Sequence, residues 1–238
     1  MPLPRRSLVL SLALLSPFSI SLFAQENGST RDEFWPELDT FIKLNDQFRL
    51  FLLASRTKAE EFDYTEAMVG VHLDFGLKPR IRIAMRDLDA TKMQYLSFRV
   101  GYRYNRSIND NENPFREHRP ILELTPRYPL PARMLLSDRN RLDLRWVNSL
   151  FSWRYRNRLT LEREFHIGEK HALTPYTSGE LYYDSRFEIW NRNRYAFGLQ
   201  TTFSKRFMVD TYYMRQNDSR SEPHHVNAFG LVLNLFFR

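Results

Sequence analysis

The chain has 238 residues, of which 42% are hydrophobic and 15% aromatic, and its formal net charge is +7 at pH 7. A mean hydropathy of −0.52 leaves no room for long apolar helices in the body of the chain, which excludes a helical membrane protein. The chain contains no cysteine, so disulfides do not stabilise it, and its length predicts one large domain as the simplest organisation.

Residues 1–24 have the organisation of a secretory signal peptide. Arg5 and Arg6 give a positive start, and the Leu-rich run that follows is short for a membrane span. The small residue Ala24 then predicts the cleavage site, which leaves residues 25–238 as the mature domain. A membrane-anchoring helix is the alternative for the same run.

Beyond a polar lead, apolar and polar residues alternate with a period of two, which is typical of strands with chemically different faces. In YLSFRVGYRYN (residues 95–105), Leu96 and every second residue to Tyr104 are apolar or aromatic, whereas Arg99 and Arg103 share the opposite face. No helical pattern interrupts the alternation, so the sequence predicts an all-β fold. The same split recurs in RNRLDLRW (139–146), WRYRNRLTLE (153–162) and RYAFGLQTTF (194–203).

Turn-rich stretches separate these segments and predict roughly twelve strands, or about ten if residues 80–86 or the first strand do not cross separately. From Tyr95 onward long and short connections mostly alternate, as an antiparallel barrel with long external loops and tight periplasmic turns requires. Before Tyr95 the alternation fails, because 45–47 is short where a long loop is expected and 56–64 is long where a turn is expected. The predicted connections are 45–47, 76–79, 107–116, 129–133, 168–171, 184–190, 204–206 and 216–225.

The polar face of the strands is crowded with charge, and arginine outnumbers lysine on it. The forked guanidinium group suits an enclosed interior, where arginines and carboxylates bond side by side. A soluble secreted β-sandwich binding protein, with its charges outside, is the alternative. Arg119 and Asp210 share this face with the predicted lumen-lining network, which consists of Arg99, Arg103, Glu123, Arg127, Arg141, Asp143, Arg145, Arg154, Arg156, Arg158, Glu162, Glu180, Arg192 and Arg194.

Two further features favour a transmembrane β-barrel over the sandwich. Aromatic residues recur near strand ends, where rings with polar tips lie well at a lipid interface. The last segment, NAFGLVLNLFFR, resembles the C-terminal strand by which outer-membrane barrels are recognised for assembly, although Arg238 departs from the usual final aromatic residue. The residues of this predicted assembly-signal strand are Phe229, Leu231, Leu233, Leu235 and Phe237.

The mature chain also resembles an uncharacterised bacterial family, domain of unknown function family 2490. The resemblance implies an outer-membrane barrel and supplies no established activity. The residues that carry it are WPELD, YRYNR, RNRLDLRW with RYRNRL, GELYYD before NRNRYAFGL, and the terminal strand.

The sequence offers little support for an enzyme. A barrel acyl hydrolase needs a Ser beside a His, and none of the six histidines precedes a serine by two residues. Asp184, Asp218, His224 and His225 fall in expected external loops, where such residues commonly serve solubility. We therefore predict no catalytic residue, metal or cofactor, and a rim hydrolase acting on lipid or peptide is the alternative.

The sequence thus predicts a non-enzymatic barrel in the outer membrane of a Gram-negative bacterium, closed by pairing of its first and last strands. Its role is structural, with a salt-bridged plug filling the lumen, or that of a narrow pore that prefers anions through Arg154, Arg156 and Arg158. The expected partners are outer-membrane lipid and, during biogenesis, the barrel assembly machinery. Nucleic acid is not expected, because the arginines are dispersed along strands and the chain is exported.

Overall fold

The computed structural model describes residues 29–59, 65–81, 88–108, 115–167 and 171–237. The predicted signal peptide, residues 1–24, lies outside this part of the chain. Across these ranges, no helix is long and apolar enough to cross a membrane.

Within the described residues the chain forms twelve strands and one short 3₁₀ helix, η1 (Ala90–Met93), between β3 and β4. The strands are β1 (Thr30–Lys43), β2 (Phe48–Ala59), β3 (Thr65–Arg80), β4 (Gln94–Ser107), β5 (Arg116–Leu130), β6 (Met134–Val147), β7 (Leu150–Arg163), β8 (Phe165–Ile167), β9 (His171–Asp184), β10 (Ile189–Ser204), β11 (Phe207–Asp218) and β12 (His225–Phe237).

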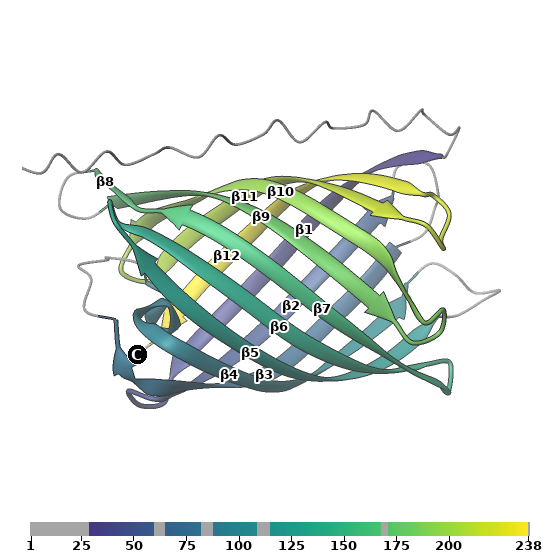
Figure 1. Cartoon of the computed structure of the whole chain (residues 1–238), viewed down its shortest axis with the longest axis horizontal. Coiled ribbons are helices and arrows are strands. Elements are labelled where there is room, and N and C mark those ends of the chain that lie inside the picture. Colours follow the sequence, from purple (N-terminus) through teal and green to yellow (C-terminus); the bar gives the residue numbers. More distant parts are fainter. Residues whose placement is uncertain (1–28, 60–64, 82–87, 109–114, 168–170, 238) are drawn as a thin grey trace, which may run out of the picture.

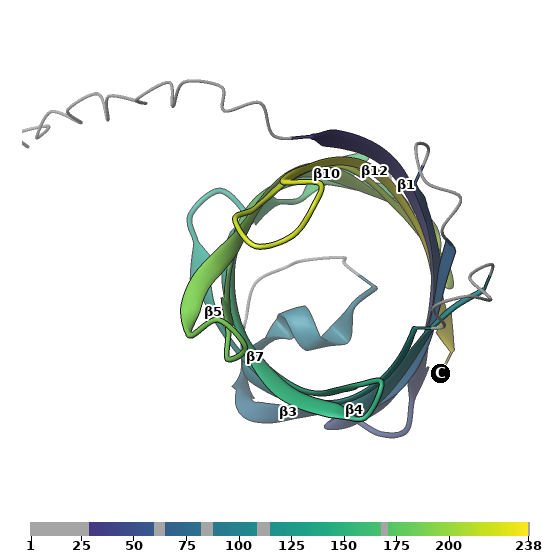
Figure 2. The same cartoon turned by 90° about the vertical axis from the view of Figure 1, so that its right-hand side faces the viewer.

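The strands form one sheet that closes on itself as a barrel (Figure 1, Figure 2). Consecutive strands pair with each other, except that β7 pairs with β9 and the short β8 pairs with the beginning of β9 beside it. The predicted all-β closed barrel is confirmed. A two-sheet sandwich is excluded, because every strand belongs to the same continuous sheet.

The barrel closes between β1 and β12, the first and last strands, and this seam is parallel. The pairing runs from Thr30 opposite His225 to Ile42 opposite Phe237. All other neighbours are antiparallel, so strand direction alternates around the wall. With eleven wall strands among the described residues, the first and last therefore run the same way. Closure between the terminal strands follows the expectation, whereas the expected antiparallel direction does not hold at this seam.

One predicted connection, residues 76–79, is wrong and explains the odd strand number. These residues belong to β3, which pairs directly with β4, so no wall strand lies between them. The pairing register shifts between Leu77 and Arg80, around Pro79. Proline has no backbone N–H to donate, so it is tolerated at such an irregularity in the ladder. Most of the segment 80–86 lies outside the described residues.

Because β3 continues through residues 76–79, the wall has one strand fewer than predicted, and short and long connections then fall at opposite ends of the barrel before Tyr95 as well. The β1–β2 turn at 44–47 now falls at the barrel end that holds the tight connections 131–133 and 205–206 (Figure 1). The longer connection 219–224 lies at the opposite end, where β4 ends and β5 begins. We call these the short-turn end, where β12 finishes, and the long-loop end, where β1 begins.

The wall has an apolar outer face and a polar inner face. On β7, Leu159 is 50% exposed on the outside, whereas the neighbouring inward residues Arg156 and Glu162 are 8% and 5% exposed. Inward glycines allow rings from the adjacent strand to lie flat on the wall: a Cβ at Gly230 would lie 2.0 Å from the ring of Tyr212. The interior is therefore filled mostly by long polar side chains and a few rings.

Candidate functional site

The barrel encloses a cavity of about 740 Å³, which is within the usual range of small-ligand sites. Its lining includes Arg186 and Glu222 from connections at the long-loop end, and Lys92 of η1 and the preceding Asp89 toward the short-turn end. Arginines outnumber carboxylates among the lining residues. The cavity thus has an arginine-rich surface, and we call it the cationic chamber; it extends from one end of the barrel to η1. Buried carboxylates behind this surface pair with several of its arginines.

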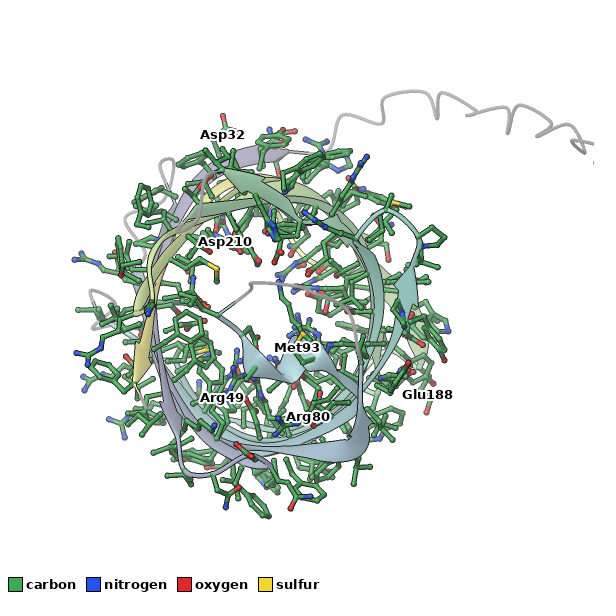
Figure 3. The ribbon with its side chains drawn as sticks, turned by 90° about the vertical axis from the view of Figure 1, so that its left-hand side faces the viewer. Asp32, Arg49, Arg80, Met93, Glu188 and Asp210 are labelled. Atoms are coloured by element: carbon green, nitrogen blue, oxygen red, sulfur yellow. The ribbon has the colours of Figure 1, made fainter. Side chains whose placement is uncertain are left out.

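The segment around η1 folds into the lumen near the short-turn end (Figure 2, Figure 3). The Lys92 ammonium donates to Gln200 Oε1 at 2.8 Å on β10 and lies 2.9 Å from a carboxylate oxygen of Glu162 on β7. On another side of the ring, Arg49 Nη1 of β2 lies 2.6 Å from Asp89 Oδ1. These contacts join η1 to three separate parts of the wall.

The η1 segment separates the large chamber from a second cavity of about 330 Å³ at the short-turn end. Asp89 and Lys92 line the first, whereas Ala90, Thr91 and Met93 line the second. The segment therefore acts as a partition across the lumen.

Local chemistry fixes the start of η1. The carboxylate of Asp89 accepts hydrogen bonds from the backbone N–H and the hydroxyl of Thr91, at 2.9 and 2.6 Å, as an N-cap residue does. Burial alone would raise the pKa of Asp89, but Arg49 and Lys92 outweigh it and hold that pKa below its ordinary range. Leu88 adds an apolar contact with the inward cluster of Phe41, Phe51, Leu53, Met208 and Phe236.

Glu180 on β9 is the centre of the charge network on one wall of the chamber. Its carboxylate lies 2.7 Å from Arg139, 2.8 Å from Arg156 and 2.7 Å from Arg158. It also accepts a hydrogen bond of 2.8 Å from the hydroxyl of Tyr182. Glu180 is only 2% exposed, so three guanidinium groups share this single buried carboxylate; Arg139 and Arg156 also lie near Glu123 and Asp143.

Other buried carboxylates repeat this arrangement elsewhere on the inner wall. Asp184 lies 2.7 Å from Arg154 and 2.8 Å from Arg186 near the long-loop end. Glu117 is bound by Arg119 and Arg145, and Asp143 by Arg141 and Arg156; Asp74 pairs with Arg49 and Arg99, and Asp218 with Arg192.

Four guanidinium groups surround the ring of Tyr182, which is 1% exposed. The carbon of Arg156 lies 4.5 Å from the ring centroid, and those of Arg154, Arg192 and Arg194 lie 5.8, 5.6 and 5.0 Å away. The ring face attracts cations, so Tyr182 helps to hold a group of arginines that would otherwise repel each other.

Three of the predicted arginines form no ion pair with a carboxylate among the described residues. Arg103 donates to His72 Nε2 at 3.0 Å, Arg127 to Ser97 Oγ at 2.8 Å, and Arg194 to Gln216 Oε1 at 2.7 Å. By contrast, the three arginines predicted to form an anion pathway, Arg154, Arg156 and Arg158, each pair with a carboxylate. Among the predicted arginines, those without a carboxylate partner in the described residues are therefore Arg103, Arg127 and Arg194, and not the three that were expected to attract anions.

All fourteen residues predicted to form the lumen network are buried or half-buried. Glu123, Arg127, Asp143 and Glu162 lie behind the chamber surface, and the other ten line the chamber itself. The prediction omitted several members of the network, although Glu117 and Arg139 follow the same period-two pattern and could have been found from it. The omitted members are Arg49, Asp74, Asp89, Lys92, Glu117, Arg139, Tyr182 and Arg186, together with Asp184 and Asp218, which were expected in external loops but are buried in the network.

The predicted assembly-signal residues all lie on the outer face of β12. Phe229, Leu233 and Phe237 are exposed, and Leu231 and Leu235 are half-buried between them. Phe229 stacks on Phe34 of β1 across the parallel seam, with ring centroids 6.1 Å apart.

The rim residues considered for hydrolysis do not form a catalytic arrangement. The carboxylate of Asp218 contacts Arg192, whereas the His224 ring contacts the backbone oxygens of Asp218 and Ser221 and the carboxylate of Glu222. Among the described residues, no serine hydroxyl is hydrogen-bonded to the His224 ring, as a hydrolase triad would require. In the described part of the chain, no group of three or more His, Cys, Asp or Glu side chains could hold a metal ion.

Comparison with known proteins gives a family and nothing more specific. No curated protein matches the chain. A family described as "Protein of unknown function (DUF2490)" matches residues 32–227, which extend from β1 into β12. Because this match covers most of the chain and nearly the whole barrel, the protein belongs to the DUF2490 family.

Proposed function

We propose that this protein spans the bacterial outer membrane as a non-enzymatic β-barrel that admits small anions into its lumen, with η1 restricting passage to the other end. The cationic chamber carries this proposal: more arginines than carboxylates line it, and Arg103 and Arg194 face it without a carboxylate partner. A lumen of this charge attracts anions and repels cations.

The outer wall supports the membrane location. Large apolar side chains are exposed along the middle of the strands, among them Val100, Leu122, Leu159 and Phe197. A water-soluble protein rarely exposes so continuous an apolar surface. A closed barrel also satisfies its backbone hydrogen bonds without water, which a membrane-spanning sheet requires.

Aromatic rings near both ends of the outer wall support the same location. At the long-loop end, Trp153 stacks on Tyr183 with centroids 5.4 Å apart, and Tyr183 meets Trp190 edge-on at 5.8 Å. Tyr128 and Phe203 are exposed near the short-turn end. Two aromatic bands separated by aliphatic residues are typical of membrane barrels.

The partition explains why we propose restricted rather than open passage. Lys92 and Asp89 join η1 to β7, β10 and β2, so the segment crosses the lumen between the two cavities. A solute that enters the large chamber must displace η1 to leave through the short-turn end. If η1 never moves, the barrel is a structural protein with a closed interior.

Ion selectivity in planar bilayers tests the proposal. Purified protein under a KCl gradient should give rare openings whose reversal potential shows anion preference. Replacing Arg103 and Arg194 with Met should weaken that preference, whereas Arg215→Met, on the outer face of β11, should leave it unchanged. Cation-preferring openings would overturn the anion-selective lumen. If no openings are recorded even when Lys92→Met detaches η1 from the wall, the protein has the structural role instead.

A further inference from the structure

Two carboxyl groups on β1 face the same chamber as Arg103 and Arg194 but form no ion pair in the described residues. Glu37 and Asp39 are successive inward residues of this strand, and both line the chamber. Asp39 is 8% exposed, and its Oδ1 atom has no hydrogen-bond partner within the described chain. Their neighbour Glu33, in contrast, is held by Arg31 and Trp35.

Two arginines without carboxylate partners in the described residues line the same chamber. Arg103 of β4 donates to His72 Nε2 on β3. Arg194 of β10 reaches toward β1 from the other side, with its guanidinium carbon 5.1 Å from the centroid of the Trp35 ring. Acidic and basic side chains that form no ion pair in the described residues therefore face one cavity.

The strand order explains this separation of charge around the chamber. β6 and β7 lie opposite β1 in the ring and carry six of the thirteen arginines that line the chamber, whereas β12, next to β1, presents no charged residue inward. Elsewhere in the lumen, inward arginines and acids meet in direct contacts of about the length of a strong hydrogen bond. The two carboxyl groups on β1 and the arginines Arg103 and Arg194 are an exception to that pattern.

Resting on the anion-admitting lumen proposed above, we infer that the chamber holds a binding site for a small zwitterion that carries both a carboxylate and an ammonium group. Its carboxylate binds Arg103 and Arg194, for which the forked guanidinium is suited. Its ammonium group binds Glu37 and Asp39, which lie on the same strand as Trp35, whose ring contacts Arg194. The chamber volume of about 740 Å³ accommodates a molecule of amino-acid size.

The site is tested by calorimetric titration of the folded, full-length protein in detergent. The probes are ω-amino carboxylates of increasing length, from glycine to 6-aminohexanoate, with hexanoate and hexylammonium as single-charge controls. One member of the series should bind at least about tenfold more tightly than either control, because both poles then contribute. The chain length of the tightest-binding probe indicates the distance between the carboxyl groups on β1 and the two arginines.

Two substitutions test which side chains bind the ammonium group and the carboxylate of the ligand, and neither removes an ion pair of the described residues. Asp39→Asn should lower zwitterion affinity by about tenfold and leave hexanoate binding unchanged. Arg103→Met should weaken the binding of both probes, and Asp32→Asn on the outer face should change neither. If Asp39→Asn does not fold, Glu37→Gln replaces it.

Equal binding of hexanoate and the zwitterions, or no effect of the substitutions on β1, would overturn this inference while anion-selective conductance still stood. No binding of any probe would also overturn it. Cation-preferring conductance would instead count against the proposed function, so the two failures are distinguishable.

Discussion

The ammonium group of Lys92 lies 2.9 Å from a carboxylate oxygen of Glu162, although the two residues belong to η1 and to β7. Lys92 is 9% exposed, so this contact is buried inside the barrel. The position of the partition is therefore coupled to a charge on the wall, and removal of that charge should change how often the lumen opens.

Lys92→Met should increase the frequency of openings in planar bilayers. The substitution removes the contacts with Glu162 and Gln200 and retains most of the side-chain volume, so η1 loses its attachment to β7 and β10. Arg206→Met, in the exposed turn between β10 and β11 and outside the lining of both cavities, is the control and should behave as the unmodified protein. Equal opening frequencies in both variants would show that Lys92 does not hold the partition.

Glu180→Gln should lower the free energy of unfolding by about 3–5 kcal/mol, because removal of one partner leaves buried charge uncompensated. The substitution preserves shape but deprives Arg139, Arg156 and Arg158 of their shared carboxylate. Urea unfolding in lipid vesicles measures the change. Glu222→Gln is the control, since the Glu222 side chain is 69% exposed and its loss should have little effect. A similar stability for both variants would contradict the role assigned to Glu180.

Tyr182→Phe removes the hydroxyl group and keeps the ring, so it tests the contribution of the hydroxyl alone. The hydroxyl accepts a hydrogen bond of 2.8 Å from Arg156 and donates one of 2.8 Å to Glu180. We expect a loss of about 1.5–3 kcal/mol in the free energy of unfolding, as for hydrogen bonds to charged groups. Tyr182→Leu should cost more, because it also removes the ring face from four guanidinium groups. If the two variants are equally stable, the ring contributes nothing beyond its hydroxyl.

Phe197→Arg tests whether the outer wall faces lipid. Phe197 lies near the middle of β10 and is 67% exposed, whereas Phe203 lies near the short-turn end of the same strand. In a bilayer, an arginine should cost about 2–4 kcal/mol at the midplane and about 0–1 kcal/mol near the interface. Folding free energies in vesicles should therefore differ between Phe197→Arg and Phe203→Arg. Two equally small costs would mean that the wall does not contact lipid.

The sequence predicted the barrel and the two faces of its strands because alternation is a local property. In the segment 95–105, each residue's side of the wall follows from its place in the chain. The turn at Asn148–Ser149 was not among the predicted connections, although both residues have positive φ angles, 46° and 74°. Such turns favour Asn-Gly, and Asn-Ser gives a weaker signal.

Features that depend on distant residues could not be predicted in this way. Residues 76–79 have turn-forming composition, but pairing of β3 with β4 overrides it. Lys92 contacts Gln200, which is 108 residues away, and no local pattern indicates that contact. The charged face was predictable, whereas which arginines share Glu180 and which lack a carboxylate depends on cross-strand register and side-chain reach.

The parallel seam constrains how such a barrel can change in size. A β-hairpin contributes two strands, so the gain or loss of whole hairpins keeps the number of wall strands odd and leaves β1 and β12 running the same way. Only the gain or loss of a single strand would make the seam antiparallel. The first and the last residue of the barrel would then lie at the same end of the cylinder. Thr30 and Phe237 thus lie at opposite mouths of the cylinder, and labels placed beside them would report from different sides of any membrane that the barrel crosses.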